Sequence, residues 1–253
     1  MKTGIADLSD QQSIRDYAQG FLATGETIDV LINNAGVMVC PFGKTADGIE
    51  MQFGTNHIGH FLLTNLLMPA ILAGANPRIV NLSSAGHTHS DVNLDDPNFE
   101  KSEYNAWESY GRSKSANIHF TQEIVQRYGD RIQSFAVHPG VIMTELGRHL
   151  TPELMNEMTE RVKSRATSSS EAKETGALPF KSVEAGAATQ VWASVTENLS
   201  ENNGAYLGDC QVGVEGGNPS ESGYLPYIFN RDTAEALWSL SEELVKQEFP
   251  KST

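Results

Sequence analysis

The chain has 253 residues and a formal net charge of −14, from 32 acidic and 18 basic side chains. Because nucleic acids and anionic membranes bind clustered Lys and Arg, this balance argues against both as partners. The length suits one large α/β core, so we expect residues 1–253 to form a single domain. Cys40 and Cys210 show neither a disulfide framework nor metal-ligand spacing, which predicts a reducing, cytoplasmic location and no metal site.

The first predicted element is a helix that begins with a capping signal at Ser9 or Asp10. Its apolar residues recur at the spacing of one helix face: Ile14, Tyr17, Ala18 and Phe21. A second, buried helix is predicted over residues 49–73, where Pro69 should kink or end the regular part. Its most apolar run, residues 61–74, is too short to cross a bilayer, so no membrane segment is expected.

Short continuous apolar runs predict strands that are buried on both faces of a parallel sheet. The run at residues 30–32 is the first, and three more lie within residues 77–84, 132–140 and, more weakly, 204–210. Helical patterns separate or follow them at residues 110–128, 183–195 and 233–245. This alternation predicts a doubly wound parallel sheet. The polar, Ser-rich stretch at residues 164–180 predicts a mobile loop.

The three clear strands all end in small or polar residues. These are Asn33-Asn34-Ala35-Gly36, then Ser83-Ser84, and then His138-Pro139-Gly140. In open α/β sheets, ligands bind at the carboxyl ends of the strands. We therefore expect a ligand site at this edge of the sheet.

The stretch YGRSK places Tyr110 four residues before Lys114. On a helix, these two side chains would share a face. A nearby ammonium favours the phenolate and lowers the phenol pKa from its usual value of about 10. The pair is thus a candidate acid/base, and an exposed pair on a solvated helix face is the alternative.

Other residues in these motifs have both a functional and a structural interpretation. Ser84 could hydrogen-bond a substrate oxygen or cap a turn. Asn56 lies in an apolar helix, where an unpartnered amide costs free energy, so it needs a backbone carbonyl or a relay water as partner. Gly36 and Gly140 let the backbone approach a ligand closely. Thr144 could hold a carboxamide.

The motifs DL, NNAG, SS, YxxxK and PGxxxT occur in the order of the classical short-chain dehydrogenases/reductases, which this chain resembles. The stretches NNAGVM, FGTNHIGHFLLT, IVNLSSAGH and KSVEAGAATQVWAS are similar to the branch of retinol-dehydrogenase-like and WW-domain-oxidoreductase-like proteins. The resemblance implies a Rossmann-like doubly wound parallel sheet. It also implies an NAD(P)-dependent oxidoreductase that interconverts an alcohol and a carbonyl by hydride transfer.

The resemblance further implies a role for each catalytic residue. Tyr110 would be the acid/base that acts on the substrate oxygen, and Lys114 would lower its pKa and bind the nicotinamide ribose. Ser84 would orient the substrate oxygen, and Asn56 would anchor a relay water.

The cofactor residues follow from the same resemblance, which favours NADP over NAD. Asp7 would meet the adenine, and Thr144 would meet the nicotinamide amide. Asn33, Ala35 and Gly36 would line the cofactor, and Leu8, Pro139 and Gly140 would also bind it. The substrate would be a small or lipophilic alcohol/carbonyl pair whose identity depends on residues 145–180, and the chain could form a homo-oligomer.

One part of the family's pattern is missing, the Gly-rich turn that holds the pyrophosphate. The chain begins MKTGIADLSD, which resembles the tail of the family's third strand, so the first two strand–helix units are expected to be absent. Residues 3–7 would then lack a neighbour, and the strand at residues 30–33 would be an exposed apolar edge. The alternative function is a catalytically inactive fragment or interaction protein derived from such an enzyme. A sugar-nucleotide epimerase, which shares the Tyr-x-x-x-Lys motif, fits less well.

Overall fold

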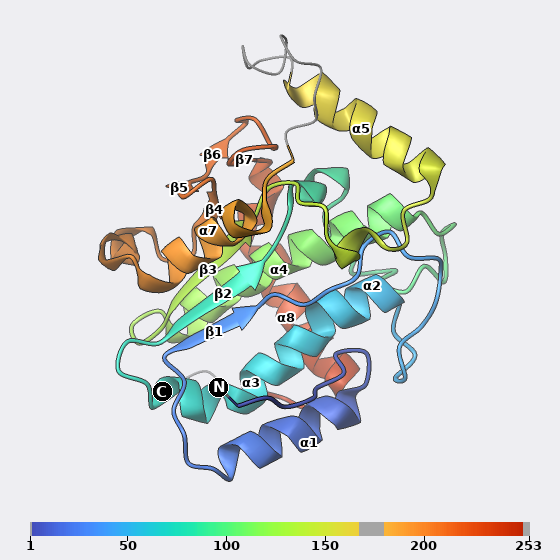
Figure 1. Ribbon diagram of the computed structural model, residues 1–253. Helices are drawn as coiled ribbons and strands as arrows, with labels where there is room; N and C mark the ends of the chain where they lie inside the picture. The colour runs from blue at the N-terminus through green and yellow to red at the C-terminus, as the bar shows by residue number, and fades with distance from the viewer. Residues whose placement is uncertain (1, 167–179, 250–253) are drawn as a thin grey trace.

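A five-stranded sheet lies at the centre of the computed structural model, which describes residues 2–166 and 180–249 (Figure 1). The strands lie side by side in chain order, and all neighbours are parallel except the last pair. They are β1 (Val30–Asn33), β2 (Arg78–Leu82), β3 (Gln133–His138), β4 (Tyr206–Gly208) and β5 (Gln211–Val212). A separate small sheet pairs β6 (Val214–Glu215) with β7 (Gly223–Tyr224). The four predicted strands are confirmed. The most weakly predicted one, within residues 204–210, is β4, which forms a short hairpin with β5.

Helices cover both faces of the sheet. They are α1 (Gln11–Leu22), α2 (Met51–Phe53), α3 (Gly59–Leu72), α4 (Ala106–Tyr128), α5 (Pro152–Ala166), α7 (Val183–Val195) and α8 (Arg231–Val245), with a π-helix at Gly54–Ile58 between α2 and α3. Short 3₁₀ turns lie at Ala85–His89, Glu145–Gly147, Glu197–Asn202 and Pro226–Phe229.

Successive strand residues face opposite sides of the sheet, as the pleat requires. In β2, Ile79 packs into the core formed by α3 and α4, whereas Val80 packs into the core that includes Ala193 of α7. Outside this layer, α8 packs on α4 and α1 packs on α3 (Figure 1). The helices α3 and α4 therefore lie on one face of the sheet and α7 on the other.

The predicted helix boundaries are partly corrected. Asp10 caps α1 by accepting hydrogen bonds from the Gln12 and Ser13 backbone N–H groups, as predicted for this position. Pro69 does not end its helix, because α3 continues to Leu72. The helix that carries YGRSK begins at Ala106 rather than at Tyr110, since the Asn105 side chain caps it.

The loop prediction for residues 164–180 is wrong at its start. Helix α5 continues to Ala166, and residues 167–179 lie outside the described part of the chain. The helix begins with Pro152, which favours the first helical turn. Its Leu154 and Met158, four residues apart, pack against the cluster of Val39, Trp107 and Tyr110.

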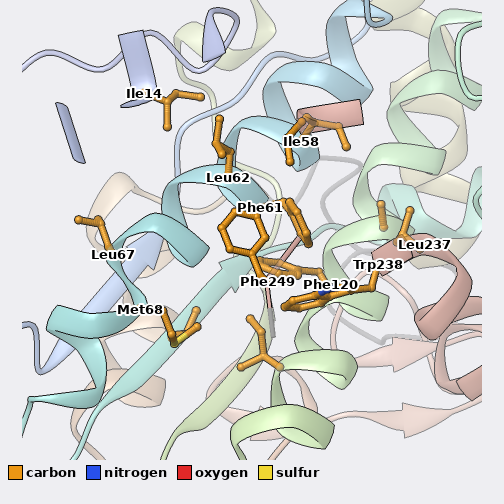
Figure 2. Close-up of a cluster of buried hydrophobic side chains, with 14 of the residues drawn as sticks. Ile14, Ile58, Phe61, Leu62, Leu67, Met68, Phe120, Leu237, Trp238 and Phe249 are labelled. Atoms are coloured by element: carbon orange, nitrogen blue, oxygen red, sulfur yellow. The ribbon is translucent and has the colours of Figure 1, made fainter. Parts of the chain in front are cut away.

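The largest core cluster joins α3, α4 and α8 around aromatic rings (Figure 2). Phe61 has no exposed surface, and its ring makes a T-shaped contact with Trp238 at a centroid distance of 4.9 Å. Phe120 of α4 and Phe249 lie 5.5 and 5.7 Å from the same ring. This cluster connects the helix after Asn56 to the helix that carries Tyr110.

Strand β1 is an edge of the sheet in the described part of the chain, where it pairs with β2 alone. Val30 and Ile32 are 37% and 41% exposed. The structure describes residues 3–7 as irregular chain, with Gly4 against the ring of Tyr17. The apolar edge expected from the sequence is therefore confirmed. None of the helices in the described ranges has the length and apolar character needed to cross a membrane.

We expect Ile32→Lys to reduce self-association of the purified chain, because a charged side chain on an edge strand opposes edge-to-edge pairing. Light scattering and sedimentation measure the associated fraction. Val212→Lys is the matched control at the opposite edge, where Val212 is 38% exposed. A chain that is already monomeric and melts cooperatively would contradict the prediction.

Candidate active site

A cleft of about 700 Å³ opens at the carboxyl ends of β1, β2 and β3. This volume lies in the range of small-molecule and cofactor sites. The loops after the three strands line it, together with residues of α4, α5 and α7. The cleft lies at the edge of the sheet where the sequence predicts a ligand site.

Tyr110 lies on the cleft wall and is 4% exposed. Its ring lies so close to Gly86 that a Cβ there would be 2.6 Å from Cε1. Burial raises the pKa of Tyr110 to about 12, and a hydrogen bond with the Ser84 side chain acts in the opposite direction. The sequence-based expectation that Lys114 lowers the pKa of Tyr110 is therefore wrong for this structure, because desolvation of the ring raises the pKa.

Lys114 lies one helical turn after Tyr110, with its Nζ 5.5 Å from the Tyr110 ring centroid. The ammonium donates to the Leu82 carbonyl at 3.1 Å. Burial lowers the pKa of Lys114 to about 8, since the charged form loses hydration. The pair is therefore buried and lines the cleft, which excludes an exposed pair on a solvated helix face.

Ser84 is held beside Tyr110 by the turn that follows β2. Its Oγ accepts a hydrogen bond from the Gly86 N–H at 3.0 Å. Its carbonyl accepts from Nδ1 of His87 at 2.7 Å. Both the capping role and the side-chain contact with Tyr110 are thus present, and Ser84 lines the cleft.

Asn56 lies in the π-helix and does not line the cleft. Its Oδ1 accepts from the Val37 N–H at 2.8 Å, and its Nδ2 donates to the Val37 carbonyl and to Ser113 Oγ, each at 2.9 Å. The backbone partner in the structural interpretation is therefore present. A Cβ on Gly36 would lie 2.7 Å from Asn56 Oδ1, so this contact requires glycine.

The cofactor residues implied for the end of β1 and the loop after it divide into two groups. Ala35 and Gly36 line the cleft. Asn33 is buried below it, where its Nδ2 donates to Thr64 Oγ1 at 2.9 Å and to Asn81 Oδ1 at 2.7 Å. Asn33 therefore ties β1 to β2 and α3.

The loop after β3 carries the next three implied residues, and all of them line the cleft. Gly140 has a φ of +88°, a conformation that favours glycine. Thr144 Oγ1 accepts from the Leu146 N–H at 3.3 Å and so caps the following turn. Pro139 completes this wall.

Asp7 and Leu8 do not line this cleft. Asp7 Oδ1 accepts from both the N–H and the hydroxyl of Ser9, and these hydrogen bonds hold the pKa of Asp7 below its usual value. The Leu8 carbonyl lies against the start of α3, where a Cβ on Gly59 would be 2.5 Å away.

Several cleft residues were not assigned a function from the sequence. Trp107 and His89 line the cleft and stack with ring centroids 5.4 Å apart. Trp107 lies three residues before Tyr110, so an earlier predicted helix start would have placed it on the same wall. His138 lines the cleft from the end of β3, and its HPG motif was the available signal. In the ranges that the structure describes, no group of three or more His, Cys, Asp or Glu could hold a metal ion.

A parallel sheet with a Tyr–Lys pair and a serine in a cleft at its carboxyl edge defines a Rossmann-like class of nucleotide-dependent proteins. The sequence model described as short chain dehydrogenase matches residues 3–154, so the chain belongs to the short-chain dehydrogenase family.

Two curated relatives agree with this family. Human retinol dehydrogenase 14 is 39% identical over 240 residues, covering 94% of this chain and 65% of the relative. The short-chain dehydrogenase/reductase prx1 of Penicillium roqueforti is 39% identical over 248 residues, covering 94% of this chain and 68% of the relative. The chain therefore spans about two thirds of the length of these relatives.

Solved structures share the fold. An uncharacterized protein from Mycobacterium paratuberculosis is 31% identical, with a TM-score of 0.69 and coverage of 97% of this chain and 75% of that one. The NADPH-bound carbonyl reductase from chicken fatty liver is 23% identical, with a TM-score of 0.51 and coverage of 80% and 72%. The similarity to the chicken carbonyl reductase shows a shared fold.

Proposed function

We propose that the protein is an NAD(P)-dependent oxidoreductase that interconverts an alcohol and a carbonyl. The observation that carries this proposal is the convergence of Tyr110, Ser84 and Lys114 on one cleft at the carboxyl edge of the sheet. Family membership and the retinol dehydrogenase relatives support the same chemistry.

In the reducing direction, the Tyr110 hydroxyl donates a proton to the substrate oxygen, and Ser84 Oγ orients that oxygen by a hydrogen bond. When bound, the nicotinamide cofactor supplies or accepts the hydride. The Lys114 ammonium lies near both Tyr110 and the Gly36 loop, and its positive charge stabilises the phenolate that remains. Asn56 holds the Gly36 loop through the Val37 backbone, and we assign it this supporting role.

The residues at the nicotinamide end fit a nucleotide cofactor. Gly36 and Gly140 give close backbone approach, and Thr144 lies at the rim with its hydroxyl toward the following turn. NADP is our first choice, because the family resemblance favours it and the chicken carbonyl reductase was crystallised with NADPH. The sequence contains no Gly-rich turn for the pyrophosphate, so we assign no residue to that contact.

The proposed substrate is lipophilic. The cleft walls above Tyr110 carry apolar side chains from three segments: Met38, Trp107, Leu150 and Met158. Such walls exclude water from a long hydrocarbon and give it little polar selectivity. The name of the relative retinol dehydrogenase 14 agrees with a substrate of this kind.

The direct test is oxidation of NADPH or NADH by the purified chain in the presence of aldehydes of increasing chain length. We expect turnover with NADPH that increases with the length of the aldehyde. A folded chain that oxidises neither cofactor with any aldehyde would contradict the proposal.

We expect kcat for carbonyl reduction to fall as pH rises above about 8, since Lys114 has its pKa lowered to about 8 by burial. The ammonium is present below this pH and lost above it, while Tyr110, with a pKa raised to about 12, stays protonated. A pH profile from 6.5 to 9.5 measures the effect. Lys114→Met should give a low rate without this alkaline limb, and a variant that keeps the limb would contradict the assignment.

A second candidate, an inactive interaction protein, is favoured by one feature of the fold. The β1 edge exposes Val30 and Ile32, and an unpaired edge of this kind can add a strand from another chain. A folded sample that binds neither NADPH nor NADH would support this candidate over the oxidoreductase.

A further inference from the structure

His138 is the last residue of β3 and has no role in the chemistry described above. It is 2% exposed and lines the cleft. Its Nδ1 lies 3.2 Å from the backbone nitrogen of Ala85 and 3.4 Å from that of Gly140. Because both partners are N–H donors, Nδ1 must be the acceptor, and the ring proton of the neutral imidazole is on Nε2.

The ring stays neutral at any pH at which the protein would work. The pKa of His138 is lowered to about 3, mainly by burial, and the nearby His87 and Lys181 act in the same direction. Asp209 and the Ser220 backbone act in the opposite direction but are smaller effects. Nδ1 is therefore available as an acceptor throughout the neutral range.

The two N–H groups belong to the two loops that flank the proposed reaction site. Ala85 directly follows Ser84 in the loop after β2, and Gly140 directly follows Pro139 in the loop after the neighbouring strand β3. The paired register of β2 with β3 ends at Leu82 and Val137, and the next backbone bond joins the Ser83 N–H to the Val137 carbonyl. Beyond that point, the imidazole of His138 continues the connection between the strands.

We propose that His138 is a positioning residue that fixes the Ser84 loop relative to the Pro139–Gly140 loop through its Nδ1. This inference rests on the proposed function, in which Ser84 orients the substrate oxygen against a cofactor held near Gly140. A displacement of about 1 Å between such groups lowers turnover by roughly 100-fold. His138 would therefore act on kcat through geometry, with no proton transfer of its own.

Two substitutions of similar polarity separate this role from a general structural one. In His138→Asn, the amide oxygen can take the place of Nδ1 and accept from Ala85 and Gly140. In His138→Gln, the polar atoms lie one carbon further along, near the position of Nε2. We expect His138→Asn to keep kcat within a few-fold of wild type and His138→Gln to lose roughly 100-fold, with a smaller change in KM. Equal activity of the two variants, whether high or low, would overturn the proposal.

A second readout does not depend on turnover. Nitrogen NMR of the unmodified chain should show an unprotonated Nδ1 in His138, and amide exchange should be slow at Ala85 and Gly140. Exchange should stay slow in His138→Asn and become fast in His138→Gln. An Nδ1–H tautomer or fast exchange in the unmodified chain would overturn the proposal. If the Ala85 and Gly140 amides exchange slowly but the chain shows no turnover, the positioning role of His138 is supported. The proposed oxidoreductase activity is then the claim that is contradicted.

Discussion

Tyr110→Phe is expected to lower kcat by about 100- to 10,000-fold, the range that a positioned general acid contributes. The phenylalanine ring keeps the packing against Gly86 and the Trp107 cluster, so the fold should persist. Only the hydroxyl that meets Ser84 is lost. Binding of NADPH should therefore change little. Steady-state kinetics and calorimetric titration of the same samples measure both quantities.

Tyr104→Phe is the matched control for this substitution. The Tyr104 hydroxyl donates to the Cys40 carbonyl at 2.8 Å and accepts from Gln52 Nε2 at 3.0 Å, and it does not line the cleft. Its removal should cost about 1 kcal/mol of stability and leave kcat unchanged. If Tyr110→Phe removed turnover and nucleotide binding to the same degree, Tyr110 would not be the acid/base.

Phe61→Ala should lower the free energy of unfolding by about 3–5 kcal/mol. Phe61 is fully buried and contacts the rings of His57, Phe120, Trp238 and Phe249, so alanine leaves a cavity among these rings (Figure 2). This loss is a large share of the 5–15 kcal/mol that is typical of a folded domain. Urea unfolding, followed by circular dichroism, gives the change.

The control for the core substitution is Phe42→Ala, because Phe42 is 51% exposed. Its ring contacts only Tyr104 among the described aromatic pairs, at 5.2 Å. We expect a loss below about 1 kcal/mol. Similar losses for both variants would contradict the assignment of the aromatic cluster as the core that joins α3, α4 and α8.

The strands β2 and β3 could be predicted because each is buried on both faces and has a continuous apolar run. Ile79 and Val80 are both 0% exposed although they face opposite sides of the sheet. Because parallel strands bring their carboxyl ends to one edge of the sheet, the sequence also predicted that Ser84 and Gly140 lie near each other at that edge.

Other features depend on tertiary contacts that a linear pattern does not contain. The π-helix around Asn56 exists where its amide meets Val37 and Ser113, which are distant in sequence. Helix α5 was missed because its apolar face is short and packs against Trp107 from a different segment. The pKa of Tyr110 could not be anticipated from Lys114 alone, because its sign depends on how deeply the ring is buried.

The measurement that tests the account most directly is a calorimetric titration of the purified chain with NADPH, followed by NADH. We expect micromolar binding of NADPH that is weakened in Lys114→Met and preserved in Tyr110→Phe. This result would show that the cleft above Tyr110 holds a nicotinamide cofactor. A folded sample that binds neither nucleotide would contradict the proposed oxidoreductase.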